Sequence, residues 1–78
     1  MGESPKMHML RILDARGDTQ LTFDPKNPVE VIDVETRFRE LMERGFVAFN
    51  VSTMPGRVMN GFDPNASEVI VTPRFAGG

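Results

Sequence analysis

The spacing of hydrophobic and polar positions changes along the chain, and the first regular pattern is that of two strands. Residues 9–13 (Met-Leu-Arg-Ile-Leu) are mostly apolar, and residues 19–23 alternate so that Leu21 and Phe23 fall on one face. Gly17 lies between the two segments and can adopt the positive φ of a tight turn. We therefore expect residues 9–23 to form a β-hairpin.

The period becomes helical after the hairpin. Apolar residues recur at positions i, i+4, i+7 and i+8, which places them in one stripe: Val34, Phe38, Leu41 and Met42. We expect a helix from Asp33 to Arg44, with Asp33 as N-cap and Gly45 as the left-handed residue after the helix. Residues 29–32 fit either an extended segment or an early helical turn.

Three further segments have strand character. Residues 46–51 form an apolar run, residues 57–59 predict a short strand, and residues 68–72 contain three consecutive β-branched residues. Such a run is typical of a strand that is buried on both faces. Pro73 cannot donate to a sheet ladder, so we expect regular pairing to stop there. Phe62 is expected to anchor the loop that follows it.

The element order predicts an α+β fold in which a mixed sheet of four to five strands packs on one helix. If the first and last strands are central neighbours, they run parallel, which is the β-grasp (ubiquitin-like) arrangement. Ile70 then faces away from Val69 and Val71, and we expect it to contribute to a partner-binding patch. The expected core consists of Leu10, Ile12, Leu21, Phe23, Val34, Phe38, Leu41, Met42, Val47, Phe49, Val69 and Val71.

Composition narrows the function classes. A chain of 78 residues makes one domain, which we place at residues 8–73, with a disordered N-terminus (1–7) and a flexible tail (74–78). The absence of cysteine excludes disulfides, thiolate zinc sites and cysteine catalysis. The single histidine, His8, provides neither a metal constellation nor a catalytic dyad. We expect a protein that is not an enzyme and holds no metal or cofactor.

Charge and hydropathy bear on partners. The net charge of −2 disfavours a nucleic-acid partner, and the apolar runs are too short to cross a membrane. Residues 1–6 are polar and no apolar segment of a signal peptide follows them. We expect a cytoplasmic monomer that binds neither nucleic acid nor membrane.

The last residues carry a resemblance. The segment from Arg74 through Phe75 and Ala76 to Gly77 and Gly78, placed after a Val-Ile-Val strand, resembles the end of ubiquitin and of the β-grasp sulfur carriers. Those carriers are the thiamin sulfur carrier and the small subunit of molybdopterin synthase. Residues 17–25 (Gly-Asp-Thr-Gln-Leu-Thr-Phe-Asp-Pro) are similar to the second strand of ubiquitin and its following turn.

The resemblance implies a reactive terminus. In these families a partner enzyme uses ATP to adenylate the terminal carboxylate, here that of Gly78, which then passes to sulfur or to an amine. Gly77 and Gly78 have no side chain to clash in a narrow channel. Arg74, Phe75 and Ala76 are then expected to contact the activating enzyme, and a target protein or a deconjugating protease is a further partner.

Three interpretations stay open at this point: a sulfur carrier, a protein modifier, and a β-grasp interaction or assembly module of bacterial or phage origin with an incidental Gly-Gly end. No lysine follows Lys26, which argues against a modifier that builds chains on itself. The residues alone do not separate the three, and they identify neither the activating enzyme nor the acceptor.

Overall fold

The computed structural model describes residues 7–53 and 55–74. Two strands, one helix and three further strands follow one another along the chain. Their bounds are β1 His8–Asp14, β2 Gly17–Phe23, α1 Pro28–Glu43, β3 Phe46–Asn50, β4 Arg57–Met59 and β5 Glu68–Pro73.

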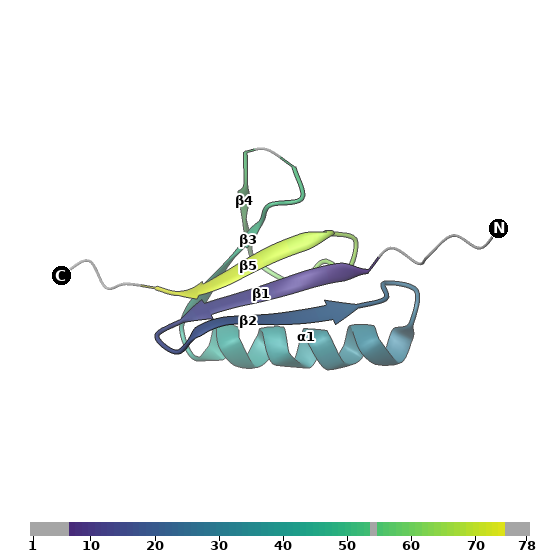
Figure 1. Cartoon of the computed structure of the whole chain (residues 1–78), viewed down its shortest axis with the longest axis horizontal. Coiled ribbons are helices and arrows are strands. Elements are labelled where there is room, and N and C mark those ends of the chain that lie inside the picture. Colours follow the sequence, from purple (N-terminus) through teal and green to yellow (C-terminus); the bar gives the residue numbers. More distant parts are fainter. Residues whose placement is uncertain (1–6, 54, 75–78) are drawn as a thin grey trace.

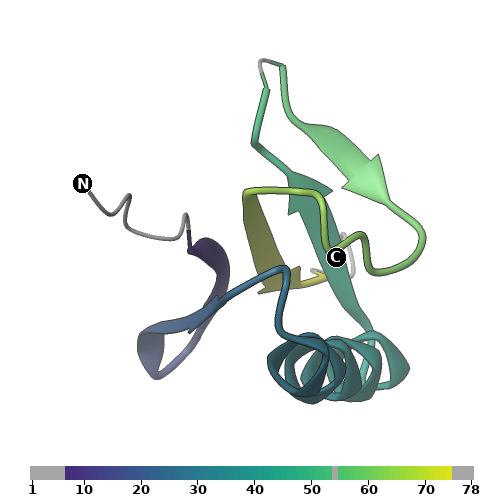
Figure 2. The same cartoon turned by 90° about the vertical axis from the view of Figure 1, so that its right-hand side faces the viewer.

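The strands form one mixed sheet in the order β2-β1-β5-β3-β4, with α1 packed on one of its faces (Figures 1 and 2). The first and last strands are neighbours near the centre and run parallel, with Leu10 opposite Val69 and Ile12 opposite Val71. The other pairings are antiparallel. The expected α+β arrangement with a parallel pair between the first and last strands is confirmed.

The helix begins earlier than expected. Asn27, and not Asp33, is the N-cap, and its Oδ1 accepts hydrogen bonds from the backbone N–H groups of Val29 (3.0 Å) and Glu30 (3.4 Å). Pro28 occupies the first helical turn, where its missing N–H costs nothing. Glu30 accepts a hydrogen bond from the Asn27 side chain at 3.0 Å, which completes the cap. Residues 29–32 are therefore helical.

The other end of the helix agrees with expectation. Helical structure ends at Glu43, and Gly45 has a φ of +92°, the left-handed conformation that favours glycine. The N–H of Gly45 donates to the carbonyl of Met42 at 3.0 Å, so the last turn keeps its hydrogen bonds. The chain then reverses directly into β3.

Alternation along the strands separates a core face from an open face. Leu10, Ile12, Val69 and Val71 are buried beneath α1, and Phe38 and Leu41 of the helix stripe meet them from the other side. Leu21 and Met42, expected in the core, are only partly buried at its border. The core thus occupies the single layer between sheet and helix.

The prediction that Val47 and Phe49 belong to the core is wrong. The register pairs Ala48 with Val71, so Ala48 points to α1 and is fully buried, while Val47 and Phe49 face away from the helix and are half-buried. Strand β3 has apolar residues on both of its faces, and the small side chain of Ala48 occupies the position where β3 contacts α1.

Aromatic rings close the core beneath the loop between β4 and β5. The Phe62 ring lies 5.5 Å from that of Phe38 and 5.8 Å from that of Phe23, measured between centroids. His8 meets Phe23 edge-on at 5.6 Å, and its Nδ1 lies 2.8 Å from the carbonyl oxygen of Pro64. Phe62 therefore anchors the loop as expected, and His8 has a structural role.

Candidate functional site

The candidate site lies where β5 leaves the sheet. Strand β5 is held on both sides, by β1 and by β3, and its Val69 and Val71 side chains are buried. It ends at Pro73, opposite Phe46 of β3, and Arg74 beyond it is exposed. A central strand that is paired on both sides therefore ends, with Pro73 and Arg74, at one end of the molecule (Figure 1).

An apolar hollow adjoins this exit. It has a volume of about 470 Å³ and is lined by the last residues of β1, the start of the β1–β2 turn and the end of β5: Leu13, Asp14, Ala15, Thr72 and Pro73. The Asp14 carboxylate accepts the backbone N–H of Arg16 at 2.9 Å, so it also stabilises the turn. Leu13 is 37% exposed, which leaves an apolar contact available next to the exit.

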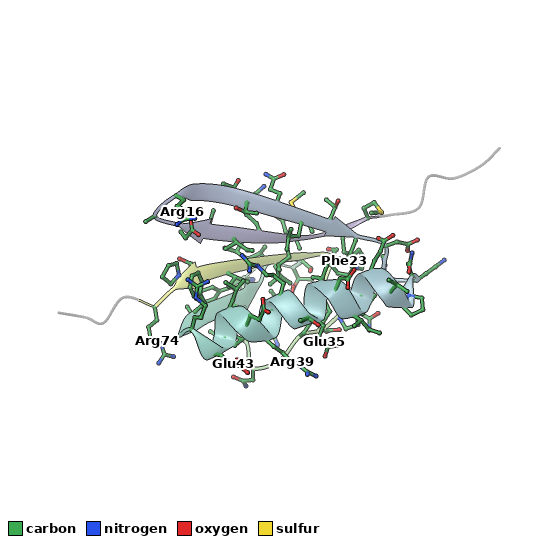
Figure 3. The ribbon with its side chains drawn as sticks, turned by 90° about the horizontal axis from the view of Figure 1, so that it is seen from below. Arg16, Phe23, Glu35, Arg39, Glu43 and Arg74 are labelled. Atoms are coloured by element: carbon green, nitrogen blue, oxygen red, sulfur yellow. The ribbon has the colours of Figure 1, made fainter. Side chains whose placement is uncertain are left out.

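Arginines gather at the same end. Figure 3 shows Arg16 and Arg74 at the end of the molecule where β5 finishes. Arg44 follows α1, and its Cζ lies 5.8 Å from the ring centroid of Phe46, the residue opposite Pro73. Within residues 7–53 and 55–74, none of the three forms an ion pair. The exit therefore presents positive charge that suits an acidic surface on a partner.

The open face of the sheet forms the second part of the site. Ile70 lies opposite Phe49, and Phe49 lies opposite Val58, so an apolar row crosses β5, β3 and β4 on the face away from α1. Val58 is 61% exposed, and Phe49 and Ile70 are half-buried. We call this row, together with Val47 and Leu13, the open-face patch.

A charged group borders the patch. Arg11 lies opposite Ile70 on β1, with its Nε 3.7 Å from Asp18 Oδ2 and its Nη1 4.0 Å from Glu68 Oε2. These side chains are one-third or more exposed, so the ion pairs contribute little to stability. They place polar contacts beside an apolar centre, as in most protein–protein interfaces.

Only two of the residues expected in the site, Ile70 and Arg74, belong to the part of the chain that the structure describes. Arg74 and Ile70 both belong to β5 or its end, with Arg74 at the exit and Ile70 on the open face. Phe75, Ala76, Gly77 and Gly78 lie outside the described residues, as does most of the expected N-terminal segment. The surface positions of Phe49 and Val58 were not predicted from the sequence, because only the register of β3 shows which face of the sheet they occupy.

The described residues form neither a metal-binding cluster nor a membrane-spanning helix. No three His, Asp or Glu side chains within residues 7–53 and 55–74 are grouped so that they could hold a metal ion. The helix in the same part of the chain is too short and too polar to cross a membrane. Comparison with protein-family models, curated proteins and solved structures finds no match to this chain.

Proposed function

We propose that this chain is a β-grasp carrier protein, of the ubiquitin-like or sulfur-carrier kind, whose Gly78 carboxylate is activated by a separate adenylating enzyme. The observation that carries the proposal is the course of β5. A central strand, fixed by pairing on both sides, leads to an exposed Arg74, and the sequence continues with Phe-Ala-Gly-Gly. The strand order and the packing of α1 on one face support the β-grasp assignment.

In the proposed chemistry, the reacting group is the carboxylate of Gly78, a residue without a side chain. A carboxylate oxygen attacks the α-phosphorus of ATP, pyrophosphate leaves, and an acyl adenylate forms. A hydrosulfide ion or an amine then attacks the acyl carbon and displaces AMP, which gives a thiocarboxylate or an amide, respectively. The enzyme supplies the nucleotide site, and this chain supplies the acyl group and the surface that positions it.

The surface around the end of β5 is suited to binding an activating enzyme. Three arginines offer cations to an acidic partner surface, namely Arg16, Arg44 and Arg74. The open-face patch, which includes Leu13, offers apolar area next to them. Positive charge at the exit speeds and orients the encounter, and apolar burial slows dissociation. A partner that covers both features holds β5 in a fixed direction relative to its own nucleotide site.

The test uses the intact chain with ATP, magnesium and the adenylating enzymes encoded in its own genome. Pyrophosphate release that depends on this chain, and that is lost when Gly78 is deleted, is the expected result. Replacing Arg74 with Glu should raise the KM for the chain, whereas replacing Arg37, a helix residue away from the exit, with Glu should leave it unchanged. Pyrophosphate release that is the same with and without Gly78 would refute the proposal.

The open-face patch favours a second function, that of a non-enzymatic interaction or assembly module. Here Val58, Phe49 and Ile70 bind a partner protein and the Gly-Gly residues have no part. Alanine at Phe49 then abolishes binding, while deletion of Gly77 and Gly78 leaves it unchanged. The two variants separate the functions in one pull-down experiment with a partner identified by crosslinking in cells.

A further inference from the structure

A second hollow lies on the helix side of the molecule, away from the open-face patch. It has a volume of about 470 Å³ and separates the C-terminal half of α1 from the turn after β4. Its lining comes from two segments that are distant in sequence: Glu35, Phe38, Arg39, Met42 and Glu43 of the helix, and Asn60, Gly61 and Phe62 of the turn. The carrier function proposed above does not use this region.

The floor of the hollow is apolar. Phe38 is almost fully buried, and Phe62 and Met42 are partly buried against the same core. The Phe38 and Phe62 rings meet at 5.5 Å between centroids with their planes inclined by 55°, which fixes the aromatic part of the floor. Met42 adds a flexible, polarisable side chain that adapts to the shape of a guest. A large aliphatic side chain is the kind of group that such a floor accepts.

The rim carries polar groups with unused bonding capacity. Figure 3 shows Glu35, Arg39 and Glu43 in a row along one side of α1. Arg39 donates to Glu35 at 3.3 Å, whereas Glu43 has no ion pair among the residues that the structure describes. The net charge of this row is therefore negative, and Glu43 supplies the uncompensated carboxylate.

Asn60 adds a group suited to a peptide backbone. The residue is exposed, and none of the side-chain hydrogen bonds found within residues 7–53 and 55–74 involves its carboxamide. A carboxamide both donates and accepts, so it can pair with the N–H and C=O of an extended segment. This group favours a peptide over a compact apolar molecule as the occupant.

Gly61 lines the hollow without contributing a side chain. Unlike Gly17 and Gly45, it does not have a positive φ, so its backbone does not require glycine. A Cβ added there would meet nothing within 4 Å. A side chain at this position would therefore enter open space without disturbing the turn.

We propose that this hollow binds an extended segment of a partner protein in which a large aliphatic side chain lies next to a lysine or arginine. The aliphatic group covers the exposed parts of Met42 and Phe62, the cation pairs with Glu43, and Asn60 pairs with the backbone. Because α1 and the open-face patch lie on opposite sides of the sheet, both partners can bind at once.

The experiment records amide spectra of the isotope-labelled full chain during titration with three capped five-residue peptides. The first has lysines on both sides of a central leucine, the second has glutamates in place of the lysines, and the third has serine in place of the leucine. The first should produce saturable shifts centred on Met42, Glu43 and Gly61, and the other two should bind about tenfold more weakly or worse.

Variants complete the test. Gly61→Leu adds a large side chain to a residue that lines the hollow, and Glu43→Lys reverses the rim charge. Each should weaken the first peptide about tenfold. Glu40→Lys makes the same charge change on an exposed helix residue that does not line the hollow, and should not alter binding. The inference is overturned if the three peptides bind equally or if the chemical-shift changes persist in both hollow variants. It is also overturned if those changes vary with protein concentration and not with peptide concentration.

Discussion

The substitution Phe38→Ala is the strongest test of how α1 packs on the sheet. Phe38 is 2% exposed, lies at the centre of the helix stripe and touches the Phe62 ring. Truncation of a buried phenylalanine to alanine lowers the free energy of unfolding by about 3–5 kcal/mol. The loss combines the transfer free energy of the removed ring with the cost of the cavity that remains. A domain of this size has a free energy of unfolding of roughly 4–12 kcal/mol. The variant should therefore lose a large fraction of the total.

Thermal unfolding by far-UV circular dichroism measures the loss, since the chain has neither Trp nor Tyr for fluorescence. Each kcal/mol lowers the midpoint by roughly 4–8 °C in a domain of this length, so we expect a decrease of about 12 °C or more. Phe49→Ala is the matched control, because the same side chain is removed from the half-buried open face. A decrease for Phe38→Ala that is no larger than that for Phe49→Ala would refute the assignment of the core face.

Three further predictions concern single features of the fold. Asn27→Ala removes the cap that accepts from Val29 and Glu30, and should lower the free energy of unfolding by about 0.5–2 kcal/mol in urea titrations; an unchanged midpoint would mean that the cap contributes nothing. Gly45→Ala forces a side chain into a φ of +92° and should cost about 1 kcal/mol, whereas Gly61→Ala, which needs no such φ, should be neutral; equal effects would contradict the left-handed turn. Ala48→Leu overfills a fully buried position of β3 and should cost about 1–3 kcal/mol by the same titration; a neutral result would place Ala48 outside the core.

The architecture could be predicted because its signals are local and periodic. The stripe of Val34, Phe38 and Leu41 identified the helix and its buried face, and Gly45 identified its end. The start of the helix was misjudged, although Asn27, Pro28 and Glu30 together make a cap signal. Proline usually interrupts regular structure, but the fixed φ of Pro28 suits the first turn of a helix.

The register of β3 could not be predicted in the same way. Val47, Ala48 and Phe49 are all apolar, so a period of two does not choose between the two faces. The larger side chains suggested the core, but pairing with β5 places Ala48 there. The open-face patch, which depends on that register, was consequently reduced to Ile70 in the sequence-based prediction.

The site on the helix side was beyond the reach of sequence patterns for a different reason. Its lining joins α1 to Asn60, Gly61 and Phe62, which are separated from the helix by β3 and β4. No spacing rule connects such segments, and the Asn60-Gly61 pair is a common turn sequence that requires no ligand. Only the position of Phe62 against Phe38 brings the two linings together.

The most direct test of the account is the intact mass, with fragmentation of the C-terminal peptide, of this chain isolated from the cells that make it. The carrier proposal predicts a chain that ends at Gly78, with a fraction in which the terminal carboxylate carries sulfur in place of one oxygen or is joined through an amide to an amine. A chain that continues past Gly78 without being trimmed, or one whose Gly78 carboxylate is wholly unmodified in cells that contain its adenylating enzyme, would contradict it.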